Sequence, residues 1–132
     1  MYSIGLNKVI SLVRGDTFEY AYDINIGTDL NPIYYQMQEG DFLYFAICEP
    51  NQPFENAVVK KRPYDYTKCY EYEYDDQWGE KETRYAVKIT LTSDDTVNLS
   101  KGKYYYTIKL AKKTEEGYDV ITTQPKTLFF LV

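Results

Sequence analysis

The residues best suited to contact another molecule lie in a stretch rich in tyrosine and acid, residues 63–83. In it, Tyr70, Tyr72 and Tyr74 alternate with acidic residues, and Trp78, the only tryptophan of the chain, follows them. Aromatic rings stack on sugar rings and anchor protein interfaces, where Tyr and Trp are enriched. The same rings can instead pair across a hairpin or cover the body of the fold. We therefore predict a binding surface here, with a structural role as the alternative.

Four carboxylates accompany these rings: Glu71, Glu73, Asp75 and Asp76. Calcium takes several oxygen ligands, but this spacing is not that of an EF-hand loop and the glycine of that loop is absent. Two carboxylates facing each other across a cleft would suit glycoside hydrolysis, and nothing in the sequence arranges two of them so. We expect a solvated, charged segment with no bound metal and no cofactor.

The chain contains no histidine. Histidine is the commonest general base and the commonest metal ligand, so its absence argues against a hydrolase or a metalloenzyme. No nucleophile motif compensates for this, and we predict a protein that is not an enzyme and has no catalytic residues. The two cysteines, Cys48 and Cys69, lack metal-ligand spacing, and Cys48 lies in an apolar run typical of a buried free thiol.

The overall composition fits one folded domain over residues 1–132. Hydrophobic residues make up 44% of the chain, which argues against disorder. The net charge of −5 argues against nucleic-acid binding, because phosphates need a basic surface. No apolar run is long enough for a membrane span, and the first residues lack the pattern of a signal peptide.

Hydrophobic residues recur at every second position through much of the chain, which predicts half-buried β-strands. The expected strands are 8–14, 17–26, 41–49, 56–62, 84–92, 103–110, 118–123 and 126–132. The run 41–49 is apolar on both faces, which favours a central strand. Many short strands without a long helical period indicate an antiparallel sandwich or barrel. The tyrosine–acid stretch is expected to form an exposed hairpin with one aromatic and one acidic face.

Two short features are predicted in more detail. In 103–110, Tyr104 and Tyr106 point into the core, whereas Tyr105 points to solvent or a partner and joins the candidate binding residues. Between 84–92 and 103–110, the sequence "TSDDTVNL" offers capping side chains and predicts one short helical turn. The tripeptide Arg14-Gly15-Asp16 is expected to form a tight turn, since glycine supplies the unusual dihedral that such a turn needs.

The stretch "SDDTVNLSKGKYYYTIKL" is similar to a domain found in tailed-phage virion proteins, with an early match in "VRGDTFEYAYDI". Family members include N-terminal modules of baseplate and receptor-binding proteins and head-fibre proteins. The tyrosine–acid stretch is not part of the family's pattern. The matching residues are Asp95, Thr96, Leu99, Gly102, Tyr104, Tyr106 and Ile108.

The resemblance implies an immunoglobulin-like β-sandwich and a non-enzymatic structural component of a tailed phage or prophage particle. Its implied partners are other virion proteins or further copies of the chain, with assembly into the virion in the bacterial cytoplasm. An alternative is a carbohydrate-binding module or adhesin domain that uses the exposed aromatic residues on a glycan. The candidate binding residues are Tyr70, Tyr72, Tyr74, Trp78 and Tyr105.

Overall fold

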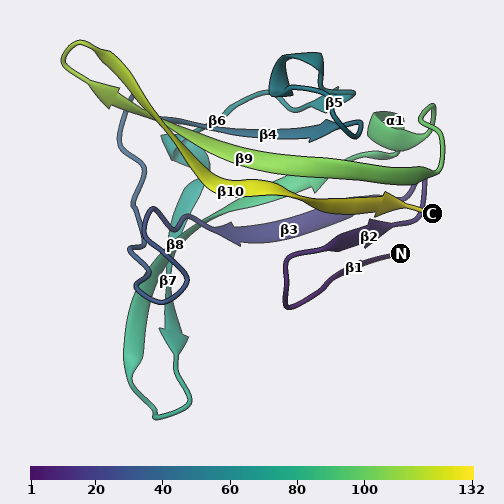
Figure 1. The fold of residues 1–132 in the computed structure, drawn as a ribbon. Coiled ribbons are helices and arrows are strands. Elements are labelled where there is room, and N and C mark those ends of the chain that lie inside the picture. Colours follow the sequence, from purple (N-terminus) through teal and green to yellow (C-terminus); the bar gives the residue numbers. More distant parts are fainter.

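The computed structural model describes residues 1–132 and shows an all-β protein with ten strands in two sheets (Figure 1). The larger sheet has the order β1-β2-β10-β9-β4-β5, with β6 also paired to β4, and the smaller has the order β3-β8-β7. The strands are β1 (Tyr2–Ile4), β2 (Ile10–Leu12), β3 (Phe18–Asp23), β4 (Phe42–Cys48), β5 (Val59–Lys60), β6 (Tyr64–Asp65), β7 (Cys69–Asp75), β8 (Lys81–Leu91), β9 (Gly102–Thr114) and β10 (Gly117–Leu131).

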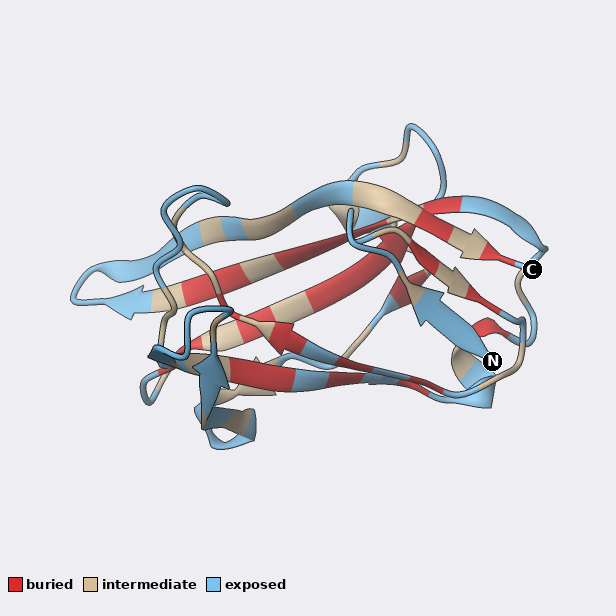
Figure 2. Ribbon diagram, turned by 90° about the horizontal axis from the view of Figure 1, so that it is seen from below, coloured by how far each residue is buried: buried red, intermediate tan, exposed pale blue.

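One hydrophobic core of 20 buried residues lies between the sheets and takes side chains from both (Figure 2). Alternation along the strands decides which residues enter it, because successive side chains point to opposite faces. Tyr104 and Tyr106 are buried, as predicted, and Tyr106 donates its hydroxyl hydrogen to the Lys8 carbonyl at 2.6 Å. Cys48 is a buried free thiol, also as predicted. Tyr105 lies half-buried on the opposite face of β9.

The expectation of a purely antiparallel arrangement is wrong at one place. Strand β2 pairs with the end of β10 in parallel, with Phe129 opposite Ile10 and Leu131 opposite Leu12. The Val132 amide extends this contact by donating to the Leu12 carbonyl at 2.9 Å. Alternation of side chains reveals that a segment is a strand, but it carries no information about the direction of its partner.

The last two expected strands are one long strand, β10, which pairs with β9 through an irregular register between Thr122 and Thr127. The irregularity accommodates Pro125, which has no amide hydrogen to donate to a ladder. The hydroxyl of Thr107 donates to the Gln124 carbonyl at 2.9 Å within it. An irregularity of the register thus takes the place of the expected break between 118–123 and 126–132.

The predicted helical turn is α1 (Ser93–Thr96). Its N-cap is Thr92, which forms a capping box with Asp95, and the Asp95 carboxylate also pairs with the Lys61 ammonium at 3.0 Å. Two further single turns, η1 (Phe54–Asn56) and η2 (Tyr66–Lys68), were not predicted. The turn expected at Arg14-Gly15-Asp16 is present, with a positive φ of 83° at the glycine.

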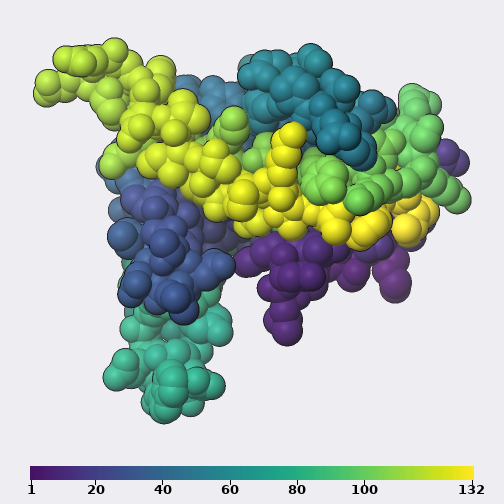
Figure 3. Space-filling model, viewed as in Figure 1, coloured from purple at the N-terminus to yellow at the C-terminus, as the bar shows by residue number.

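Two hairpins project beyond the body of the fold, one formed by β7 and β8 and the other by the ends of β9 and β10 (Figures 1 and 3). The two chain termini lie together at the other end of the molecule (Figure 1). The hairpin of β7 and β8 contains most of the tyrosine–acid stretch. The first residues of the tyrosine–acid stretch lie outside this hairpin, because Tyr64 and Asp65 pair with β4 instead.

Candidate functional site

We call residues 70–84 the arm, because they form the projecting part of the β7–β8 hairpin (Figure 3). Tyr72 lies opposite Arg84, and Tyr74 lies opposite Glu82. Since side chains alternate along a strand, the three tyrosines of β7 share one face and Glu71 and Glu73 share the other. The hairpin places the tyrosines of β7 on one face and its glutamates on the other, but the faces are mixed, because Arg84 and Glu82 share the tyrosine face.

The tip of the arm presents Trp78. The Asp76 carboxylate accepts hydrogen bonds from the amides of Trp78 and Glu80, at 2.8 and 2.9 Å, and this closes the turn. Gly79 has a positive φ of 81°, which completes the reversal. The Trp78 side chain is left 80% exposed, and no aromatic ring of the chain pairs with it. An indole so exposed is available to a partner.

The base of the arm is tied to the body by a charged cluster. The Arg84 guanidinium contacts the Asp23 carboxylate at 3.3 Å and the Glu82 carboxylate at 3.1 Å. Tyr72 donates its hydroxyl hydrogen to Asp23. Burial, together with this bond to an ionised acceptor, raises the pKa of Tyr72 to about 12. Tyr72 thus lies half-buried as an anchor of the arm.

Arg84 also lies between two tyrosine rings, which makes it the centre of the cluster. Its guanidinium carbon is 3.7 Å from the centroid of Tyr74 and 4.8 Å from that of Tyr34. Cations over aromatic faces attract the ring quadrupole. Tyr34 belongs to the loop between β3 and β4, so this stacking joins the arm to a third segment of the chain and restrains the motion of the arm relative to the body. Tyr70 and Tyr74 remain 39% and 43% exposed.

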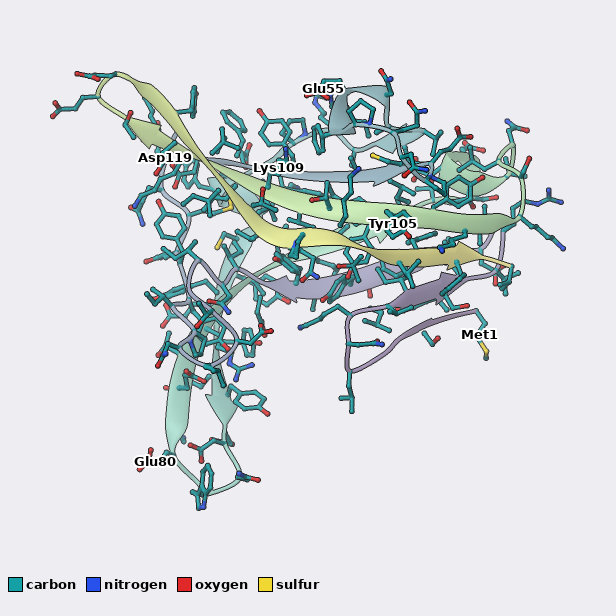
Figure 4. All side chains as sticks on the ribbon, in the orientation of Figure 1. Met1, Glu55, Glu80, Tyr105, Lys109 and Asp119 are labelled. Atoms are coloured by element: carbon teal, nitrogen blue, oxygen red, sulfur yellow. The ribbon has the colours of Figure 1, made fainter.

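Tyr105 is not near the other candidate binding residues. It lies on β9 in the larger sheet, with the Lys103 ammonium 5.8 Å from its ring centroid, whereas the arm extends from the smaller sheet (Figure 4). The structure therefore places Tyr70, Tyr72, Tyr74 and Trp78 on one hairpin, with Trp78 at its tip and apart from the tyrosine rings, and leaves Tyr105 on the other sheet.

A second surface, which the sequence analysis did not identify, is an open apolar groove of about 400 Å³ on the outer face of the larger sheet. We call it the outer groove. It forms because β4, β9, β10 and η1 meet there, and the only hint in the sequence is that β4 is apolar on both faces. Its lining residues are Phe42, Tyr44, Phe54, Lys109, Ala111, Tyr118 and Val120.

No buried polar side-chain atom lacks a hydrogen-bond partner. No cluster of three or more acidic, cysteine or histidine side chains is arranged to hold a metal ion. The buried Asp41 carboxylate accepts hydrogen bonds from the Tyr35 hydroxyl and from the amides of Gln38 and Lys113, at 2.6, 2.8 and 2.8 Å. None of the helices has the length and apolar character needed to cross a membrane.

Three comparisons with known proteins add no relative. No protein-family model matches the chain, no curated protein matches it, and no solved structure matches the fold. Functional conclusions therefore depend on the residues and contacts described above.

Proposed function

We propose that the fold is an immunoglobulin-like sandwich. The smaller sheet has the order β3-β8-β7, and the larger sheet contains the order β2-β10-β9-β4-β5. The larger sheet corresponds to the second sheet of a variable-type immunoglobulin domain, which likewise extends beyond three central strands. This correspondence supports the proposal. A second support is the hydrogen bond from the Tyr104 hydroxyl to the Ser100 carbonyl, at 2.7 Å, where the chain enters β9. A tyrosine bonded to the backbone just upstream at this corner is a hallmark of such domains.

We further propose that the protein is a non-enzymatic structural component of a tailed-phage or prophage particle that acts by docking to other proteins. The two segments that resemble phage virion proteins support this assignment, since they meet in space. The Gly15 amide donates to the Thr96 hydroxyl at 2.9 Å, and the Arg14 guanidinium donates to the Leu99 carbonyl at 3.4 Å. The resembling residues thus form one corner of the fold, which favours a common architecture over a chance match of short motifs.

The observation that carries the docking mechanism is the exposed Trp78 at the end of an arm that Arg84 fastens to the body. A buried aromatic side chain contributes roughly 150–250 Å² to an interface, and a standard interface buries about 800 Å² per partner. Because Trp78 is 80% exposed and Tyr70 and Tyr74 are 39% and 43% exposed, their rings can supply roughly 250–400 Å², at most about half of that area. A fastened arm loses little conformational freedom on binding, and this lowers the entropic cost of association.

The experiment is an assembly assay in the source phage with the double variant Tyr70→Ala, Trp78→Ala. We expect the variant to fold as the wild type does, because both side chains are exposed, but to be depleted from purified particles. The matched control is Leu30→Ala, which changes an apolar side chain that is 92% exposed and outside the arm. Incorporation of the double variant at the wild-type level would remove the arm from the mechanism.

A second candidate function is glycan binding, which the exposed rings of Tyr70 and Trp78 favour, whereas the Arg84 guanidinium already covers one face of the Tyr74 ring. Sugar rings stack on such faces. Strong and selective binding of the isolated protein to a glycan array, abolished by Tyr70→Ala, would favour this function over docking to a protein.

A further inference from the structure

We propose that copies of this chain associate head to tail, with Trp78 of one copy seated in the outer groove of the next. The inference rests on the proposed docking role of the arm and deepens it by naming the partner as a second copy.

The outer groove suits a large aromatic side chain. All but one of its lining residues are hydrophobic, and its volume of about 400 Å³ lies in the range of pockets that bind organic groups. Tyr118 and Val120 at its rim are 54% and 60% exposed, so that their apolar surface has no cover within the chain. Contiguous exposed apolar surface of this kind marks interaction sites.

Charge selects the arm as the occupant. Residues 70–84 contain six carboxylates, Lys81 and Arg84, which gives a net charge of −4 of the chain's −5. The outer groove carries Lys109, with Lys60 beside it, and their ammonium groups lie 4.8 and 4.9 Å from the centroid of Phe54. The acids of this region are Glu55 on η1 and Asp65, which lies opposite Phe42. A third lysine, Lys113, lies opposite Tyr118. An acidic arm is thus attracted to a predominantly basic rim, which speeds encounter and fixes orientation.

These charges are also free to form new pairs. Lys60 and Lys109 take part in no ion pair within the chain, and on the arm neither Asp75 nor Asp76 does. The two lysines instead cover the Phe54 ring, where they can turn toward an arriving carboxylate while the ring accepts the indole.

The contact must join two different copies. Glu80 marks the end of the arm, and Lys109 and Glu55 mark the outer groove; Figure 4 shows them on opposite sides of the molecule. The arm extends from the smaller sheet, away from the outer face of the larger one, and so does not reach its own groove. Each copy therefore offers one arm and one groove, and such an interface produces a ring or an open chain of copies.

The test is sedimentation velocity of the purified full chain from micromolar to millimolar concentration, with tryptophan fluorescence recorded in parallel. We expect the mean mass to rise with concentration and to fall at high salt, because screening weakens charge attraction. The emission of the single tryptophan should shift to shorter wavelength as the mass rises. Trp78→Ala and Val120→Asp should each weaken association at least about tenfold, as loss of a central anchor does. Leu30→Asp, which alters neither surface, should associate as the wild type does.

Mixing the two defective variants gives the sharpest readout. Trp78→Ala retains a working groove and Val120→Asp retains a working arm, so an equimolar mixture should form a 1:1 dimer that grows no further. A mixture that stays monomeric while both variants remain folded would overturn the inference, as would a wild type that is monomeric at every concentration. The latter result would leave the proposed docking function standing, since that function depends on incorporation into particles.

Discussion

Replacing Arg84 by alanine removes the side chain that ties the base of the arm to the body of the protein. The variant is informative because Arg84 lies in β8, whose position in the smaller sheet is maintained by β3 and β7 on its two sides. We expect the fold to survive and its stability to fall, with the loss concentrated in the arm.

The size of the loss follows from the contacts of Arg84. The bond to Asp23 joins two side chains that are 18% and 27% exposed and contributes about 1.5 kcal/mol. The two stacked tyrosine rings add about 0.5–1 kcal/mol each. The pair with Glu82, whose side chain is 43% exposed, adds less than about 0.5 kcal/mol after solvent screening. We therefore expect Arg84→Ala to lower the free energy of unfolding by about 3 kcal/mol.

Urea unfolding measures this loss, which corresponds to a midpoint about 1.5 M lower when the slope is about 2 kcal/mol per M. The matched control is Lys88→Ala in the same strand. Lys88 pairs with Glu19 at 3.6 Å, but both side chains are more than half exposed, so its loss should cost less than about 0.5 kcal/mol. Hydrogen exchange should show faster opening of β7 in Arg84→Ala alone. Equal stabilities of the two variants would refute the role given to the cluster.

Four further predictions concern the body of the fold, and urea unfolding measures each of them. Asp41→Ala should cost about 3 kcal/mol, since it leaves three donors without their buried acceptor; a loss below about 1 kcal/mol would contradict this. Asp95→Asn should cost about 2 kcal/mol, because it weakens the capping box and the ion pair with Lys61; no change would argue against both. Burial opposes ionisation of these two carboxyls, yet their hydrogen bonds hold the pKa of each below its ordinary value. The stability that these two carboxylates contribute should therefore be complete above about pH 4, and it should be lost as the pH falls through their lowered pKa values in the folded state. The loss of stability on acidification should be smaller in Asp95→Asn than in the wild type. Tyr104→Phe should cost about 1 kcal/mol through loss of the bond to the Ser100 carbonyl, and an unchanged stability would remove that bond from the account of the corner.

Local patterns in the sequence were enough to predict most of the strands and the faces of their residues. Tyr104 and Tyr106 enter the core and Tyr105 does not, because the pleat of a strand enforces alternation. The helical turn was expected because Thr92, Ser93 and Asp94 can each cap a helix. The structure uses Thr92, in a capping box with Asp95 only three positions away.

Features that depend on distant segments were not predictable from such patterns. The Arg84 cluster joins β8 to Asp23, 61 residues away, and to Tyr34 in a loop. The outer groove is lined by Phe54 and Tyr118, which are remote in sequence and lie over the same face of the larger sheet. The parallel pairing of β2 with β10 likewise depends on where the last strand ends, and hydrophobic periodicity contains no signal for that.

The measurement that tests the central claim most directly is mass spectrometry of purified phage particles after induction of the source strain. A structural component of the particle should give peptides of this chain at a fixed stoichiometry through successive purification steps, and its copy number would indicate its location. Particles free of the chain, while the protein is abundant in the cells or the medium, would contradict the account.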